Sequence, residues 1–208
     1  MPAEYDHLIR FLRQENTRLK DENQLLTDEV RALRRYIGAL QRLQGTVQRF
    51  TPEQDILTLL DETLDCALGL LDTAAGSLLL IDEETDELVF VLVHGAVRET
   101  LPGYHFDRRQ GVAGWVAEHA EPAIVNNARA DRRFLLEVDD RFGFETHSLA
   151  AVPLVARGRV LGVVEVLNKR SGESFTDDDA SLLSILAALA ASALDYAASA
   201  PVEAEEQP

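Results

Sequence analysis

The sequence predicts a mixed α/β (α+β) protein in which an N-terminal coiled-coil helix precedes an antiparallel sheet with helices on both faces. Three observations support this prediction. Leucines recur every seventh residue through the first 40 residues, which is the heptad pattern of a coiled coil. Beyond residue 70, apolar runs of strand length occur in two pairs, each joined by a short turn. A long, alanine-rich helical segment follows the second pair.

The N-terminal heptads predict a parallel dimer over residues 1–50. Leucine at position d with β-branched residues at position a favours two parallel strands, and Asn at position a disfavours other oligomers and registers at a cost in stability. The alternative is a single long solvated helix. A leucine-zipper DNA reader is not expected, because residues 1–8 do not form a basic region. The residues expected to form the dimer seam are Leu12, Asn16, Leu19, Asn23, Leu26, Val30, Leu33, Ile37 and Leu40.

Charged residues beside the seam suit the same arrangement. In a parallel, in-register dimer, position g of one helix meets position e of the other, five residues later. This places Glu15 beside Lys20 and Glu29 beside Arg34. Each exposed pair contributes about 0–1 kcal/mol, so these pairs select the partner more than they stabilise the dimer.

Charge is distributed unevenly along the chain. Residues 1–50 hold nine Lys or Arg and seven Asp or Glu, whereas the remainder holds eleven and 29. The whole chain has a net charge of −16, and all of the negative excess lies beyond residue 50. A surface this acidic repels phosphate backbones and anionic lipid, so neither nucleic acid nor a membrane is an expected partner. The single cysteine, Cys66, excludes an intrachain disulfide framework. Because the first residues do not resemble a signal peptide, we expect a cytoplasmic protein.

Residues 51–198 are expected to form one domain, followed by a disordered acidic tail at 199–208. The stretch 126–147 is polar and carries phenylalanines, so it is expected to be a functional loop or lid with some helix of its own. The first and last helices carry surplus apolar surface, which a second copy of the chain would cover. The expected elements are a helix over 51–71, strands over 77–81 and 88–94, a short helix over 111–119, a short strand over 122–125, strands over 148–155 and 159–168, and a helix over 176–198.

Two runs of sequence resemble a GAF domain: GVAGWVAEHAEPAIVNNARADRRF at residues 111–134 and SLAAVPLVARGRVLGVVEVLNKRSGESFTDDD at residues 148–179. The resemblance covers about residues 52–198. GAF domains are small α/β sensor modules. The resemblance therefore implies an antiparallel sheet with the first and last helices on one face and a ligand pocket on the other. It also implies dimerisation through those helices, with coiled coils relaying the signal.

The resemblance extends to part of the spaced motif that marks cyclic-nucleotide receptors of the family. Asn168, Lys169, Phe175 and Asp179 match in order, whereas Ala180 stands where the motif has its closing acid. We interpret the four matching residues as structural, with Lys169 pairing with Asp179 to fix the last helix to the last strand. Whether a cyclic nucleotide binds is left open by this comparison.

Other chemistries of the family lack the residues that they need. Bilin attachment requires a cysteine in the pocket half, whereas Cys66 is in the first helix, and methionine sulfoxide reduction requires redox cysteines. The histidines show no metal-ligand spacing with carboxylates, so no metal site is predicted and the cofactor is undetermined. The sequence contains no phosphate-binding glycine loop or nucleophile elbow, so we do not expect an enzyme.

The candidate ligand contacts each have a structural alternative. The aromatic residues could belong to the core or pin the loop, the tandem asparagines could form a turn, and Arg129 could be solvated. Glu165 is the one charge in an apolar strand, so a buried carboxylate here needs a partner. It either forms a helix-facing hydrogen bond, which we favour, or serves as an acid in the pocket. The candidates are Trp115, Asn126, Asn127, Arg129, Phe134, Phe144, His147 and Glu165.

The sequence thus favours a non-enzymatic, dimeric signalling or regulatory module that senses a small ligand and relays it through helices to a separate partner protein. The alternative is a dimeric interaction scaffold without a small-molecule ligand. An enclosed cavity with convergent polar groups favours the first hypothesis, and a filled interior favours the second.

Overall fold

The computed structural model describes residues 9–27, 30, 37–38 and 56–199. The chain divides into two compact units, Met1–Gly45 and Thr46–Pro208, each of which is described by itself. Of the predicted seam, Leu33 and Leu40 lie outside the described residues, as do residues 51–55 of the helix predicted over 51–71 and all of the predicted tail beyond Ser199.

In the N-terminal unit, residues 9–27 form a helix whose apolar seam lies on the surface of the single chain. Leu12 is 56% exposed and Leu26 is 59% exposed. Glu15 accepts a hydrogen bond of 3.1 Å from Arg18 Nε, and Glu22 accepts one of 2.9 Å from the same guanidinium. Charges are therefore paired along the helix, while the leucines of the seam have no cover within the described residues.

The second unit is built on one six-stranded antiparallel sheet with the strand order β3-β2-β1-β6-β5-β4. Two hairpins, β1–β2 and β5–β6, are joined at its centre by pairing between β1 and β6. The strands are β1 (Thr73–Asp82), β2 (Glu87–His94), β3 (His105–Asp107), β4 (Ala123–Val125), β5 (Leu149–Ala156) and β6 (Arg159–Lys169). The helices are α2 (Ile56–Leu71), α3 (Gly111–His119), α4 (Leu136–Phe142) and α5 (Asp177–Ser199), with a 3₁₀ turn η1 (Ala128–Ala130).

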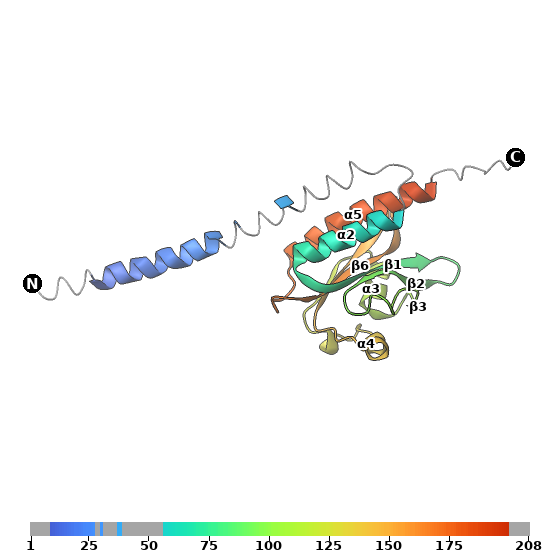
Figure 1. Cartoon of the computed structure of the whole chain (residues 1–208), viewed down its shortest axis with the longest axis horizontal. Helices are drawn as coiled ribbons and strands as arrows, with labels where there is room; N and C mark the ends of the chain where they lie inside the picture. Colours follow the sequence, from blue (N-terminus) through green and yellow to red (C-terminus); the bar gives the residue numbers. More distant parts are fainter. Residues whose placement is uncertain (1–8, 28–29, 31–36, 39–55, 200–208) are drawn as a thin grey trace, which may run out of the picture. The chain divides into compact units, whose positions relative to one another are not determined.

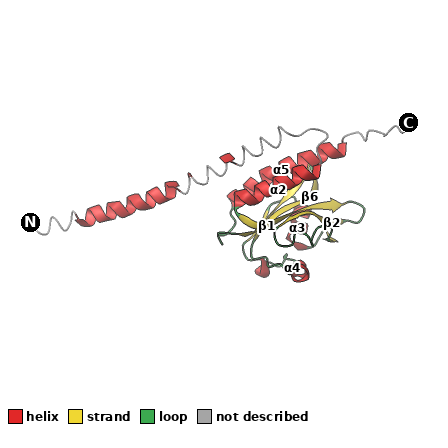
Figure 2. Ribbon diagram, viewed as in Figure 1, coloured by secondary structure: helices red, strands yellow, loops and turns green. Residues whose placement is uncertain are grey.

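The sheet separates two layers of helices. The helices α2 and α5 lie side by side on one face, and α3 and α4 lie on the other, as Figures 1 and 2 show. Leucines from α2 and α5, among them Leu60, Leu64 and Leu186, are almost fully buried against Leu78 and Val164 of the central strands. The predicted antiparallel sheet with helices on both faces is therefore confirmed, and the coiled coil that precedes it stays a prediction.

The last helix begins with a capping box formed by Thr176 and Asp179. The backbone N–H of Asp179 donates to Thr176 Oγ1 over 3.3 Å, and the backbone N–H of Thr176 donates to Asp179 Oδ2 over 2.8 Å. Along α5, Leu183 and Leu186 are buried, whereas Ile185 is 54% exposed and Leu189 is 38% exposed. Among the described residues, α5 is the one helix that is long and apolar enough to cross a membrane, judged by its length and composition alone. In this fold, one side of α5 packs on the sheet.

A candidate ligand cavity

A cavity of about 80 Å³ lies between the sheet and the layer formed by α3 and the segment around α4. Strands β1, β2 and β6 form one wall, and residues 134–146 form much of the other. The walls are largely apolar and include five phenylalanines. The aromatic and polar residues that line it are Ser77, Phe90, His94, Phe106, Phe134, Asp139, Phe142, Phe144, Thr146 and Glu165.

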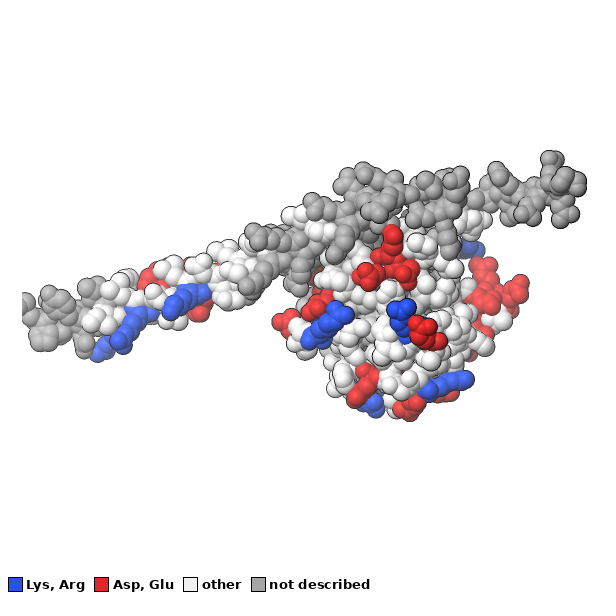
Figure 3. All heavy atoms as spheres, in the orientation of Figure 1, with Lys and Arg blue, Asp and Glu red and all other residues white. Residues whose placement is uncertain are grey.

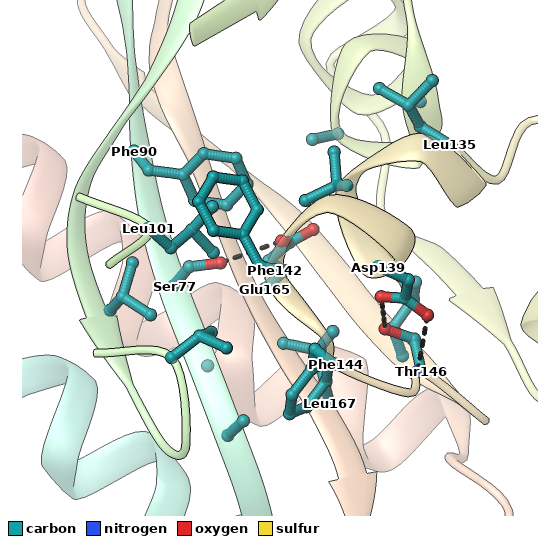
Figure 4. A pocket seen from close by; sticks show the side chains of 18 of the residues that line it. Ser77, Phe90, Leu101, Leu135, Asp139, Phe142, Phe144, Thr146, Glu165 and Leu167 are labelled. Atoms are coloured by element: carbon teal, nitrogen blue, oxygen red, sulfur yellow. Dashed lines mark hydrogen bonds between the residues drawn. The ribbon is translucent and has the colours of Figure 1, made fainter. Parts of the chain in front are cut away.

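Glu165 is the acid at the floor of this cavity. The partly accessible surface of its side chain faces the cavity, and the surrounding protein shields it from bulk water. Ser77 Oγ of the neighbouring strand donates a hydrogen bond of 2.8 Å to Glu165 Oε1 (Figure 4). Burial raises the pKa of Glu165 to about 7, the Ser77 hydrogen bond opposes this shift, and the charge of Asp139 adds to it. Glu165 therefore changes its charge near neutral pH.

The second acid, Asp139, holds the segment opposite the sheet together. Asp139 is 5% exposed, and its two oxygens accept hydrogen bonds of 2.8 Å from the backbone N–H and the hydroxyl of Thr146. Figure 4 shows these two bonds closing the turn after α4. Gly143 allows this turn, because it ends α4 in the left-handed conformation at φ 66°. Thr146 thus partners one cavity acid, whereas Glu165 has only Ser77 as a donor among the described residues.

His94, the last residue of β2, connects the cavity wall to α2. Its Nε2 lies 2.7 Å from Asp61 Oδ1, and its Nδ1 lies 3.9 Å from Asp65 Oδ1. Both ring nitrogens are therefore close to carboxylates of α2, while the residue also lines the cavity.

Lys and Arg are absent from the residues that line the cavity. The nearby arginines have other partners. Arg133 donates hydrogen bonds of 3.0 and 2.7 Å to Asp131, which lower the pKa of that carboxyl, and it lies over the Trp115 ring. Arg141 lies 4.9 Å from the centre of the Tyr104 ring. The described residues also bring together no group of three His, Cys, Asp or Glu side chains suited to a metal ion.

A family model described as a GAF domain matches residues 53–195 of the chain, which is more than half of its length. The chain belongs to the GAF family. GAF domains are regulatory, ligand-sensing modules, and the cavity of this GAF domain lies on the sheet face opposite the first and last helices.

The curated relatives include cyclic-nucleotide phosphodiesterases. The GAF domain is 32% identical over 145 residues to a probable 3′,5′-cyclic phosphodiesterase, pde-5, of Caenorhabditis elegans, a match that covers 65% of this chain and 20% of that protein. It is 42% identical over 76 residues to the dual 3′,5′-cyclic-AMP and -GMP phosphodiesterase 11A of Takifugu rubripes, covering 36% of this chain and 8% of that protein. The chain thus spans a fifth or less of these enzymes.

Solved structures share the fold at low sequence identity. The GAF domain of a phosphoenolpyruvate-protein phosphotransferase from Coxiella burnetii has a TM-score of 0.68 at 19% identity, covering 78% of this chain and 95% of that one. A free methionine-R-sulfoxide reductase from Neisseria meningitidis has a TM-score of 0.64 at 18% identity, covering 81% and 92% of the two chains. These likenesses establish the architecture alone.

The structure brings three of the eight predicted ligand contacts to the cavity, namely Phe134, Phe144 and Glu165. The preferred interpretation of Glu165, a helix-facing hydrogen bond, is wrong, because its partner is Ser77 of β1 and it lines the cavity. Alternation along β6 explains this: the neighbours Val164 and Val166 are buried, and Val164 contacts the helical layer that contains α2 and α5, so Glu165 points the other way.

The other predicted contacts do not line the cavity. Trp115 stacks on His119 with ring centres 4.4 Å apart, because α3 turns Val112 and Ala113 toward the cavity instead. Asn126 bridges two segments, donating to the Phe175 carbonyl over 3.1 Å and accepting from the Phe175 N–H over 2.7 Å. Asn127, Arg129 and His147 are exposed outside the cavity. Arg129 and His147 each lie about 4 Å from Glu145.

The four residues that match the cyclic-nucleotide motif also lie outside the cavity. Asn168, at φ 55°, accepts hydrogen bonds from the N–H groups of His147 and Ser148 and donates one to the Glu145 carbonyl. The expected pair between Lys169 and Asp179 is present at 2.6 Å, with side chains 11% and 15% exposed. Phe175 is buried beneath Lys169 Nζ. Each of these residues has a structural partner.

Sequence reasoning missed Ser77, His94, Asp139 and Thr146 as cavity residues. The signal for Ser77 was its place opposite Glu165 in the register of β1 and β6. Asp139 and Thr146 had no such signal, because their separation of seven residues becomes a contact only once the turn at Gly143 forms.

Proposed function

We propose that this GAF domain belongs to a non-enzymatic, dimeric signalling or regulatory module that senses a small ligand and relays its binding through helices to a separate partner protein. The observation that carries this proposal is a cavity that holds a buried carboxylate, Glu165, with one hydrogen-bond donor. Ionised groups in such surroundings are costly to bury, and strongly shifted pKa values are common at functional sites.

The arrangement of the sheet supports sensing. The cavity and the pair α2/α5 contact opposite faces of the same central strands, β1 and β6. A shift of these strands on ligand binding would therefore be felt directly by α2 and α5. A ligand shifts such an equilibrium only by its difference in affinity for the two states. Membership of a regulatory family, together with the lack of an assembled metal site in the described residues, favours sensing over catalysis.

The proposed dimer rests on exposed apolar residues. Leu12, Leu19 and Leu26 of the heptads and Ile185 of α5 are between 46% and 59% exposed. Leucines repeated along one helix seam seldom stay in water when a second copy can cover them. We further propose that the dimer acts in the cytoplasm on a protein partner, without binding nucleic acid or membrane.

The second candidate is a dimeric interaction scaffold with no small-molecule ligand. The volume of the cavity favours it, because 80 Å³ is small beside the roughly 300–1,000 Å³ of typical ligand pockets. A scaffold of this kind would keep the dimer contacts and have no use for Glu165.

Native mass spectrometry of freshly purified full chain tests sensing against scaffolding. We expect a dimer that carries a small molecule, and a thermal-shift panel of metabolites and nucleotides that raises Tm for a subset of compounds. Sedimentation measures the oligomer in parallel. A ligand-free dimer that no compound stabilises would favour the scaffold, and a monomer at micromolar concentration would refute both candidates.

A further inference from the structure

We infer that the cavity selects a small organic cation, an alkylammonium whose charged group binds Glu165 and whose apolar part contacts the phenylalanine walls. This inference rests on the proposed ligand-sensing function and names the class of ligand. It follows from the charges of the cavity, its unused hydrogen-bonding capacity, its aromatic walls and its size.

The charge of the cavity is one-sided. Asp139 and Glu165 line it, whereas Lys and Arg do not. The ring nitrogens of His94 are close to Asp61 and Asp65, so any positive charge on that ring already faces two carboxylates of α2. The exterior differs, since Figure 3 shows acidic and basic side chains intermixed on the visible face of the domain. An anionic ligand would therefore be repelled by Asp139 and Glu165, and no Lys or Arg of the cavity wall would bind it.

Glu165 has the acceptor capacity that an ammonium needs. Its Oε1 accepts from Ser77, and the described residues supply no donor to Oε2. Asp139 is different, because Thr146 donates to both of its oxygens. A carboxylate binds two or more donors, and bonds between charged partners are stronger than neutral ones. Glu165 is therefore the acid that a ligand ammonium would contact.

The walls and the volume restrict the rest of the ligand. Phenylalanine faces attract cations as well as apolar groups, and the cavity has five such rings. A cavity of about 150 Å³ accepts benzene, so a cavity of 80 Å³ fits a molecule smaller than benzene unless the roof at 134–146 shifts. A short alkylamine meets these limits, and a branched one of four carbons, which is about as large as benzene, requires a small outward shift of that roof.

Binding of such a cation depends on pH. The pKa of Glu165 lies near 7, with Asp139 of α4 and His94 of β2 as the other titratable groups that line the cavity. An alkylammonium keeps its proton in this range, as Lys does with a pKa of about 10.4. Because the ammonium prefers ionised Glu165, its affinity should rise as pH increases from 6 to 8.

Calorimetry with three isosteric probes tests the inference on the full chain. The probes are isobutylamine, isobutanol and isobutyrate, which differ in charge but little in shape. We expect isobutylamine to bind at least about tenfold more tightly than isobutanol at pH 8, a difference of about 1.4 kcal/mol, and isobutyrate to bind most weakly. The preference for the amine should shrink at pH 6.

Glu165→Gln provides the decisive variant, because the amide keeps its shape and can still accept from Ser77. It should remove the tenfold preference for isobutylamine and its pH dependence, with isobutanol unchanged. Glu118→Gln, at an exposed position of α3, is the matched control and should behave as the original chain. Circular dichroism checks the fold of both, and the pH series on the original chain tests the inference even if Glu165→Gln fails to fold.

The outcomes separate this inference from the proposed function. Tighter binding of isobutanol or isobutyrate, or an amine preference that survives Glu165→Gln, would overturn the assignment of a cation while leaving ligand sensing intact. A neutral or anionic molecule found by native mass spectrometry would do the same. Absence of binding by all three probes overturns the cation assignment. Sensing is overturned as well only if native mass spectrometry finds the chain ligand-free and no compound of the thermal-shift panel stabilises it.

Discussion

The two faces of the sheet are packed in different ways. On the α2/α5 face, leucines and alanines leave a void of only about 10 Å³. On the α3/α4 face, the void is about 80 Å³ and its walls include two acids and two hydroxyls. Adjacent residues of the same strand separate the two: Leu78 and Val164 belong to the first face, and Ser77 and Glu165 to the second. We conclude that the α2/α5 face stabilises the fold by close packing, whereas the cavity and its acids make the α3/α4 face less stabilising.

Leucine truncation on the two faces should give the largest contrast. Leu60 is fully buried beside α5, whereas Leu101, 6% exposed, lines the cavity. Leu60→Ala should lower the free energy of unfolding by about 3–5 kcal/mol, because it opens a void in close packing. Leu101→Ala should cost nearer to about 2 kcal/mol, because part of its surface already lacks neighbours. Urea denaturation measures both, and equal costs would contradict the contrast.

Glu165→Gln should stabilise the fold in a pH-dependent way. Burial raises the pKa of Glu165 from 4.5 to about 7, so below pH 4.5 the residue is protonated in both folded and unfolded chains and costs nothing. Between these values the unfolded chain releases the proton first, so the original chain loses stability as pH rises, up to about 3 kcal/mol. The variant lacks this loss.

Denaturation of both proteins at pH 5, 6, 7 and 8 measures this difference. The advantage of Glu165→Gln should grow through the series and level off above pH 7. Glu118→Gln should show no trend, because its side chain is exposed. An advantage that is constant with pH would show that Glu165 keeps its ordinary pKa.

Threonine-to-valine changes should give the smallest contrast. Thr146→Val removes one of the two donors to buried Asp139 and should cost about 1–2 kcal/mol. Thr63→Val, on α2, removes only a 2.8 Å hydrogen bond from the Thr63 hydroxyl to the Leu59 carbonyl. That carbonyl keeps its backbone hydrogen bond within the helix, so the change should cost less than about 0.5 kcal/mol. Thermal unfolding at constant pH compares them, and a larger loss at Thr63 would reverse the assignment of the two faces.

Elements with a continuous apolar pattern could be predicted from the sequence, whether long or short, and extended segments without one could not. The helix at Gly111–His119 has the predicted bounds, and the second hairpin is correct to within a residue at each end. The strand β3, residues His105–Asp107, was missed because His-Phe-Asp contains one apolar residue, whereas the equally short β4 is the apolar run Ala-Ile-Val. Residues 73–76 of β1 were missed because Thr-Ala-Ala-Gly lacks the large β-branched residues typical of strands.

The candidate site was less predictable than the fold. Glu165 stood out as the one charge in an apolar strand, but the face it occupies depends on which neighbours meet α2 and α5. Both faces of β6 are covered, so its hydrophobic pattern does not assign a side. Trp115 was selected for its aromatic ring, whereas the direction of α3 decides that Val112 lines the cavity instead.

The strand β6 is continuous over 11 residues, and it contains both Glu165 and Lys169. The first lines the cavity, and the second is fixed to Asp179 at the start of α5 by a 2.6 Å ion pair that is largely shielded from water. The two positions are separated by about 13 Å of extended backbone, which resists stretching and bending within a sheet. The strand is consequently a stiff connection between Glu165 in the cavity and the N-terminus of α5.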